Sequence, residues 1–261
     1  MRLTDFHTHA FPDALAPIAV EQLARQGGIP YHYDGTVAGL LAAMACAGID
    51  RSVVAPVATK PSQVRTINDW VTSLDDPRLV PFGAMHPDFE DPAAEIARAT
   101  ALGIRGLKMH GEYQSFAPDD PRMVPIYAAA ERHGLIMLFH AGADVGPQTV
   151  RGTPEAFARM LDAHPSLTVV LAHMGGFRQW DGVREHLLGR SVYLDTAYTL
   201  GHLPDEEFVA LVRDHGIGRV LFGSDGPWTD AAAELERLRA MPFSAGELAA
   251  ILGANADRLL D

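Results

Sequence analysis

In this 261-residue sequence the histidines are the residues best placed to take part in catalysis or metal binding, because several of them end apolar runs. His7 and His9 close the run DFHTH, and their spacing of two puts both on one face of a β-strand. His140 ends LIMLFH, His173 ends TVVLAH, and Asp225 follows LFGS. Neutral imidazoles and a carboxylate are the ligands of a borderline-soft divalent ion such as Zn2+, which needs three or four of them.

A second polar group lies in the run GLKMHGE. Lys108 and His110 are two residues apart and therefore share a strand face, whereas Glu112 falls beyond the end of the strand. We expect Lys108 to bind a substrate carboxylate and His110 to be a neighbouring substrate contact. Glu112 is expected to be either a supporting group or a further ligand, and Trp228 an apolar wall of the pocket.

Apolar runs that alternate with amphipathic stretches must position these residues. The predicted strands cover 2–9, 51–57, 79–85, 104–110, 135–140, 168–173, 191–195 and 219–223. The predicted helices cover 17–26, 37–47, 61–74, 92–102, 123–133, 154–164, 183–188, 205–215 and 231–241. The sequence SAGE at 244–247 is a capping box that predicts one more helix.

Eight strands alternating with helices predict an α/β protein with a parallel sheet, either a (β/α)8 barrel or an open doubly wound sheet. No glycine-rich phosphate loop follows the first strand, and no linker divides the chain. We therefore predict one (β/α)8 TIM-barrel domain over 1–261. The carboxyl ends of all barrel strands form one mouth, so the strand-end histidines and Asp225 should converge there.

Composition narrows the classes of partner. The chain is 48% hydrophobic, enough for a sizeable core, and its net charge of −12 with no basic tract argues against nucleic acid and anionic membranes. No apolar run reaches the ~20 residues of a membrane span, and the N-terminus is unlike a signal peptide. The single cysteine, Cys46, is expected to be buried and favours a reducing compartment, so we predict a cytoplasmic protein. We expect a small-molecule substrate, and the sequence leaves open whether the protein forms a homo-oligomer.

Five segments in order resemble the metal-dependent amidohydrolase superfamily. They are DFHTH, KMHGEYQ, LFHAG, LAHMGG and FGSD, spread over nearly the whole chain. The closest resemblance is to the amidohydrolase-2 branch, which holds hydrolases alongside relatives of aminocarboxymuconate-semialdehyde decarboxylase. The branch usually has a proline after the fourth-strand histidine, where this chain has Gly111.

The resemblance implies a (β/α)8 barrel whose catalytic metal is held by His7, His9, His140 and Asp225. It implies that His173 stands beside the metal as an acid/base or oxyanion-polarising group. A divalent ion lowers the pKa of its bound water to about 7 and so supplies hydroxide. Asp225 would then accept and deliver the proton, and His173 would stabilise charge on the carbonyl oxygen.

The number of metal ions stays open at this point. In some superfamily members a carboxylated fourth-strand lysine bridges two ions, and in others a fourth-strand glutamate does so. Lys108 and Glu112 raise that question here, although we favour Lys108 as a plain cation. The expected cofactor is one Zn2+ ion per chain, with a second metal as the alternative.

Three functions fit this site. The favoured one is a metal-dependent hydrolase that uses metal-bound hydroxide on a small carboxylic ester, lactone or amide. The alternative is a metal-dependent non-oxidative decarboxylase of a small unsaturated or aromatic acid. Hydrolysis is favoured because the decarboxylase relatives tend to be longer and this chain is close to a minimal barrel. A non-catalytic metal-binding barrel is the third, disfavoured by an intact acid/base pair.

Overall fold

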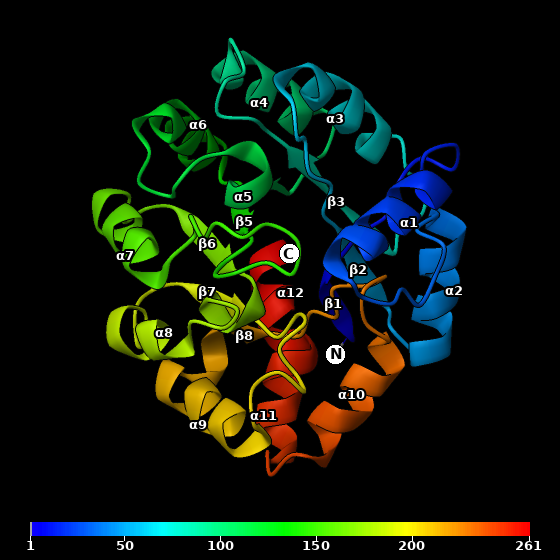
Figure 1. The fold of residues 1–261 in the computed structure, drawn as a ribbon, viewed down its shortest axis with the longest axis vertical. Coiled ribbons are helices and arrows are strands. Elements are labelled where there is room, and N and C mark those ends of the chain that lie inside the picture. Colours follow the sequence, from blue (N-terminus) through cyan, green and yellow to red (C-terminus); the bar gives the residue numbers. More distant parts are fainter. Residues whose placement is uncertain (1) are drawn as a thin grey trace.

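The protein is a parallel β-barrel surrounded by helices, as the computed structural model shows for residues 2–261 (Figure 1). Eight strands pair in chain order, and every paired neighbour is parallel. They are β1 (Thr4–Thr8), β2 (Arg51–Val54), β3 (Leu79–Ala84), β4 (Gly106–Met109), β5 (Ile136–Phe139), β6 (Thr168–Leu171), β7 (Tyr193–Asp195) and β8 (Val220–Leu221).

Helices form a ring around the strands (Figure 1). The α-helices are α1 (Ala16–Gly27), α2 (Val37–Ala47), α3 (Val64–Thr72), α4 (Pro92–Ala101), α5 (Gly111–Gln114), α6 (Val124–His133), α7 (Pro154–Ala163), α8 (Trp180–His186), α9 (Asp205–His215), α10 (Ala231–Ala240), α11 (Ala245–Ala249) and α12 (Asn255–Leu260). Shorter helical segments are η1 (Pro61–Gln63), η2 (Pro121–Met123), η3 (His173–Gly175), η4 (Ile217–Arg219) and η5 (Ala250–Ala254).

Backbone contacts between β1 and the chain around β8 close the barrel. The amide of Phe6 donates to the carbonyl of Phe222 at 2.8 Å, and the amide of His9 donates to that of Gly226 at 2.7 Å. A parallel bridge pairs Thr8 with Gly226. The first and last strands are therefore neighbours, which brings His7 and His9 to Asp225.

Two apolar clusters make the core. The larger lies between the strands and the surrounding helices, and the smaller fills the barrel. The smaller cluster contains Phe6, Val53, Ala55, Phe82, Ile136, Leu138, Val170, Leu221, Ala256 and Leu260. The last two belong to α12, which lies near the centre of the barrel in Figure 1. Arg51 at the start of β2 pairs with Asp257, and Arg105 just before β4 donates to the carbonyl of Leu260, so this helix lies at the end opposite the strand carboxyl ends.

The predicted barrel and all eight strands are confirmed, with strand ends one to three residues shorter in most cases. The capping box is also confirmed, since Ser244 accepts from the amide of Glu247 and Glu247 from the amide of Ser244.

The expectation that Cys46 is buried is wrong, because it is exposed. The buried residues of α2 are Leu40 and Met44, four positions apart on one face of the helix. Cys46 comes two residues after Met44 and therefore lies on a different face. Within residues 2–261 no helix is both long and apolar enough to cross a membrane.

Candidate active site and metal centre

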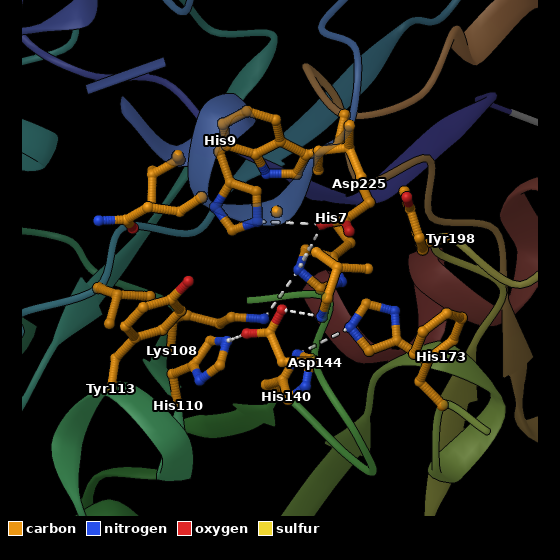
Figure 2. A pocket seen from close by; sticks show the side chains of 18 of the residues that line it. His7, His9, Lys108, His110, Tyr113, His140, Asp144, His173, Tyr198 and Asp225 are labelled. Carbon is orange, nitrogen blue, oxygen red and sulfur yellow. Dashed lines mark hydrogen bonds and ion pairs between the residues drawn. The ribbon is translucent and has the colours of Figure 1, made fainter. Parts of the chain in front are cut away.

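A cavity of about 420 Å³ opens at the carboxyl ends of the strands (Figure 2). Every residue predicted for the site lines it, apart from Glu112. The predicted residues that line the cavity are His7, His9, Lys108, His110, His140, His173, Asp225 and Trp228. The barrel thus brings together residues that are more than 200 positions apart in the sequence.

A register shift in β1 aims His7 at the cavity. The pairing of β1 with β2 shifts between Asp5 and Thr8. Phe6 packs in the barrel interior, and yet its neighbour His7 lines the cavity, which strict strand alternation would not allow. Bulges of this kind redirect side chains beside functional sites. Gly223 makes room for the arrangement, because a Cβ there would lie 2.9 Å from the Cβ of His7.

His173 and Asp225 are held by an uncommon backbone conformation. Their φ angles are +59° and +71°, in the left-handed region that residues other than glycine seldom adopt. The strand β6 ends at Leu171, two residues before His173, so the left-handed turn and not the strand directs this imidazole into the cavity. Such conformations concentrate at active sites, where the surrounding structure enforces them.

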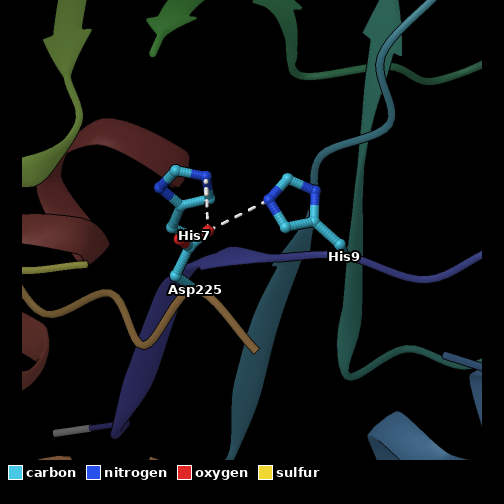
Figure 3. A group of neighbouring side chains, drawn as sticks. All are labelled: His7, His9 and Asp225. Atoms are coloured by element: carbon cyan, nitrogen blue, oxygen red, sulfur yellow. Dashed lines mark hydrogen bonds and ion pairs between the residues drawn. The ribbon is translucent and has the colours of Figure 1, made fainter. Parts of the chain in front are cut away.

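His7, His9 and Asp225 form a compact group whose ligand atoms all lie within 4.8 Å of one another (Figure 3). Nδ1 of His7 donates to Asp195 Oδ2 at 2.9 Å, and Nδ1 of His9 donates to the carbonyl of Ala55 at 2.9 Å. If both rings are neutral, their Nε2 atoms therefore carry no hydrogen and present a lone pair. These two atoms lie 3.3 and 3.1 Å from Asp225 Oδ1. Lone pairs on all three atoms suit a divalent cation, so this donor set fits the expected metal.

His140 lies beside this group without being part of it. Its Nε2 donates to the carbonyl of Ala143 at 3.0 Å, and Nδ1 of His173 donates to the carbonyl of Ala197 at 2.8 Å. The remaining nitrogens, His140 Nδ1 and His173 Nε2, are 3.0 Å apart. In neutral rings these two nitrogens also present lone pairs, so His140 stays a proposed fourth ligand and His173 a proposed catalytic group.

Burial favours the neutral form of three of these imidazoles, by lowering the pKa of His7, His140 and His173. It is the main cause that lowers the pKa of His7 and His140 well below the usual value. The charge of Lys108 acts in the same direction on both rings, and that of His110 on His140. Burial also lowers the pKa of His173. A metal ion binds only the neutral form of imidazole, so burial of these three rings favours metal binding.

Asp195 at the end of β7 is a supporting residue that the sequence reasoning missed. One carboxylate oxygen accepts from Nδ1 of His7, and the other accepts from the amides of His173 and Ala197 at 2.9 and 3.1 Å. It is fully buried. A carboxylate behind a metal-binding histidine fixes the ring and raises its basicity, so Asp195 orients both sides of the site.

Lys108 projects from β4 into the same group (Figure 2). Its Nζ donates to Nε2 of His7 at 2.8 Å, and the residue is only 1% exposed. Burial lowers the pKa of Lys108 to about 8, although the charges of Asp225, Asp195 and Asp144 oppose this. Among the described residues that line the cavity, Lys108 is the only lysine or arginine.

A second group with metal-ligand spacing consists of His110, His140 and Asp144. His110 Nε2 is 3.2 Å from Asp144 Oδ2, and His110 Nδ1 is 3.4 Å from Glu112 Oε2. Burial alone would lower the pKa of His110, but these two carboxylates raise it above its usual value. The carboxylates of Asp144 and Glu112 thus favour the charged form of His110, and we infer a metal only in the group of His7, His9 and Asp225.

Glu112 lies behind His110 and outside the cavity lining. Its Oε1 accepts from the amides of Arg151 and Gly152 at 2.8 and 3.3 Å. Glu112 therefore contacts His110 and supports the backbone of the loop after β5. Asp144, in that same loop, was missed by the sequence reasoning because nothing in the sequence marks it apart from its place four residues after His140.

Aromatic side chains form much of the remaining wall. The lining includes Phe11, Tyr113, Phe177, Tyr198 and Trp228, together with aliphatic residues of α1 and the loops. The lining thus combines ionisable side chains with apolar and aromatic ones, as is typical of small-molecule sites.

A (β/α)8 barrel with histidines and an aspartate at its strand ends is the architecture of metal-dependent barrel enzymes. The model of the amidohydrolase family matches residues 4–261, so the chain belongs to the amidohydrolase family. A search of curated proteins found no match.

Solved structures share the fold over their full length. An uncharacterized TIM-barrel protein from Bordetella bronchiseptica is 22% identical with a TM-score of 0.78, and 100% of this chain and 98% of that chain are covered. The 5-carboxyvanillate decarboxylase of Novosphingobium aromaticivorans, complexed with manganese and 4-hydroxy-3-methoxy-5-nitrobenzoic acid, is 17% identical (TM-score 0.76, coverage 99% and 96%). The 2,6-dihydroxybenzoate decarboxylase from Rhizobium is 16% identical (TM-score 0.73, coverage 100% and 98%).

Proposed function

We propose that this protein is a metal-dependent, non-oxidative decarboxylase of a small aromatic or unsaturated carboxylic acid. The observation that carries the proposal is the cavity itself, in which the group of His7, His9 and Asp225 meets aromatic walls. Two structurally similar proteins are decarboxylases of aromatic acids, which supports the same reaction class.

The metal would be held by His7, His9 and Asp225, with His140 as a further proposed ligand. When bound, a divalent ion supplies a Lewis acid that polarises an oxygen of the substrate. The ion is proposed as divalent only, because one similar decarboxylase was solved with manganese and the donor set also suits zinc.

The chain's own residues would do the rest. Lys108 binds the substrate carboxylate as the one lysine of the cavity lining, and the aromatic walls hold the ring or double bond. Loss of CO2 breaks the bond to the carboxyl carbon and leaves the electron pair on the substrate carbon, which then takes a proton. Asp225 and His173 lie at the polar end of the cavity and are the groups proposed to deliver it.

Hydrolysis, the reaction favoured by the sequence, has less support. The argument for it was chain length, but the similarity to the decarboxylases extends over 96% or more of those chains. An ester, lactone or amide would use the same ligands and the same acid/base pair, so the two reactions have to be separated by their products.

Incubation of the metal-loaded protein with hydroxybenzoates and muconate-type acids in D2O is expected to release CO2 and to place one deuterium on the vacated carbon. Headspace analysis measures the gas, and NMR locates the label. A parallel panel of carboxylic esters, lactones and amides in 18O-labelled water serves as the comparison. Turnover of that panel with 18O in the product acid, and no CO2 from any acid, would establish a hydrolase instead.

A further inference from the structure

Lys108 donates to the same nitrogen that a metal ion would need. Nδ1 of His7 is committed to Asp195, so Nε2 is the one nitrogen of this ring left for a metal. That atom accepts from Lys108 Nζ at 2.8 Å and lies 3.3 Å from Asp225 Oδ1. Because Nε2 has a single lone pair, it cannot accept from the ammonium group and bind a metal at the same time.

The charges around Lys108 explain why a lysine lies here. Burial lowers the pKa of Lys108, which is only 1% exposed, and the negative charges of Asp225, Asp195 and Asp144 oppose this by favouring its ammonium form. Buried carboxylates without a cation are costly, so a positive charge is needed in this part of the cavity when no metal is bound. Among the described residues that line the cavity, Lys108 is the only lysine or arginine, and its Nζ lies against His7 Nε2.

We propose that Lys108 is an internal counter-cation of the metal site, which neutralises the site in the metal-free chain and competes with the ion for His7. This inference rests on the metal centre of the proposed function. On metal binding the ammonium group has to leave His7, and it is then free to meet the carboxylate of a substrate in the cavity. Lys108 therefore lowers the affinity of the site for metal and is not itself a ligand.

Substitution of the lysine tests the idea, with a matched control. The chain has two lysines, Lys60 and Lys108, and Lys60 is exposed. Titration of the metal-free proteins with Mn2+ is expected to show Lys108→Met binding about 10-fold more tightly than the wild type, because competition and repulsion are removed. Lys60→Met, which removes the same charge from the surface, should bind like the wild type.

The outcomes separate the two proposals. A wild-type chain that binds no Mn2+ overturns the metal centre of the proposed function. A wild-type chain that binds Mn2+, with Lys108→Met binding equally or more weakly, overturns the role of Lys108 alone and makes the lysine an ordinary neighbour or a ligand.

A second measurement needs no substitution at Lys108, in case that variant does not fold. In a chain labelled with 15N at its lysine Nζ atoms, the two signals are assigned by the loss of one in Lys60→Met. Addition of Zn2+ is expected to shift the Lys108 signal as its contact with His7 breaks, while the Lys60 signal stays in place. A Lys108 signal unmoved at saturating Zn2+ contradicts the proposal.

Discussion

Asp225→Asn is expected to lower kcat/KM by about 1,000-fold or more, because one change removes both a metal ligand and a proton carrier. Asp225 Oδ1 faces the Nε2 atoms of His7 and His9, and a neutral amide oxygen is a weaker partner for a divalent ion. Kinetics on any substrate found by the product screen, together with metal analysis of the variant, measure the effect.

The same substitution should leave the fold intact. Asn accepts the left-handed φ of +71° at this position at least as well as Asp, and the backbone amide that donates to the carbonyl of His7 is kept. An unchanged unfolding temperature of the metal-free protein is the control. If Asp225→Asn stays within 10-fold of the wild type at saturating metal, Asp225 has neither role.

His173→Asn is expected to reduce kcat by about 100-fold or more while the protein keeps its metal. The reason is that His173 lies outside the compact group of His7, His9 and Asp225 but presents Nε2 to the same cavity. Asparagine again tolerates the left-handed φ of +59°, and the amide that donates to Asp195 remains.

A matched histidine controls for the loss of an imidazole. His86 is 5% exposed, lies outside the cavity lining, and its Nδ1 accepts from the amide of Asp88, so His86→Asn should retain activity. Metal content measured on both variants completes the comparison. A loss of metal in step with activity in His173→Asn would make His173 a ligand and not a catalytic group.

Strand alternation and strand ends were enough to predict much of this molecule. The pattern of β4 correctly placed Lys108 and His110 at the cavity, and that of β5 placed His140 there. These strands are regular, so residues two positions apart in the sequence lie on the same face of the strand in the structure. Asp195 ends β7 in the same way that the histidines end theirs, and the criterion applied to them would have found it.

The remaining features depend on local backbone geometry that counting does not capture. His173 reaches the cavity through a left-handed turn, and His7 through a register shift in β1. Asp144 belongs to a loop whose path is set by contacts with Glu112 and Phe177, residues distant in sequence. Glu112 was expected to be a supporting group or a further ligand, and α5, which no pattern predicted, turns its carboxylate toward the backbone of that loop.

The most direct test of the metal centre is an anomalous difference map from crystals grown without added metal, with the element identified by its X-ray absorption edge. We predict one peak per chain, bonded to Nε2 of His7, Nε2 of His9 and the carboxylate of Asp225, at about 2.0–2.2 Å if the ion is zinc. The same map reads out whether His140 is a fourth ligand. A map with no peak at these residues, or with a peak held by His110 and Asp144 in its place, would contradict the account.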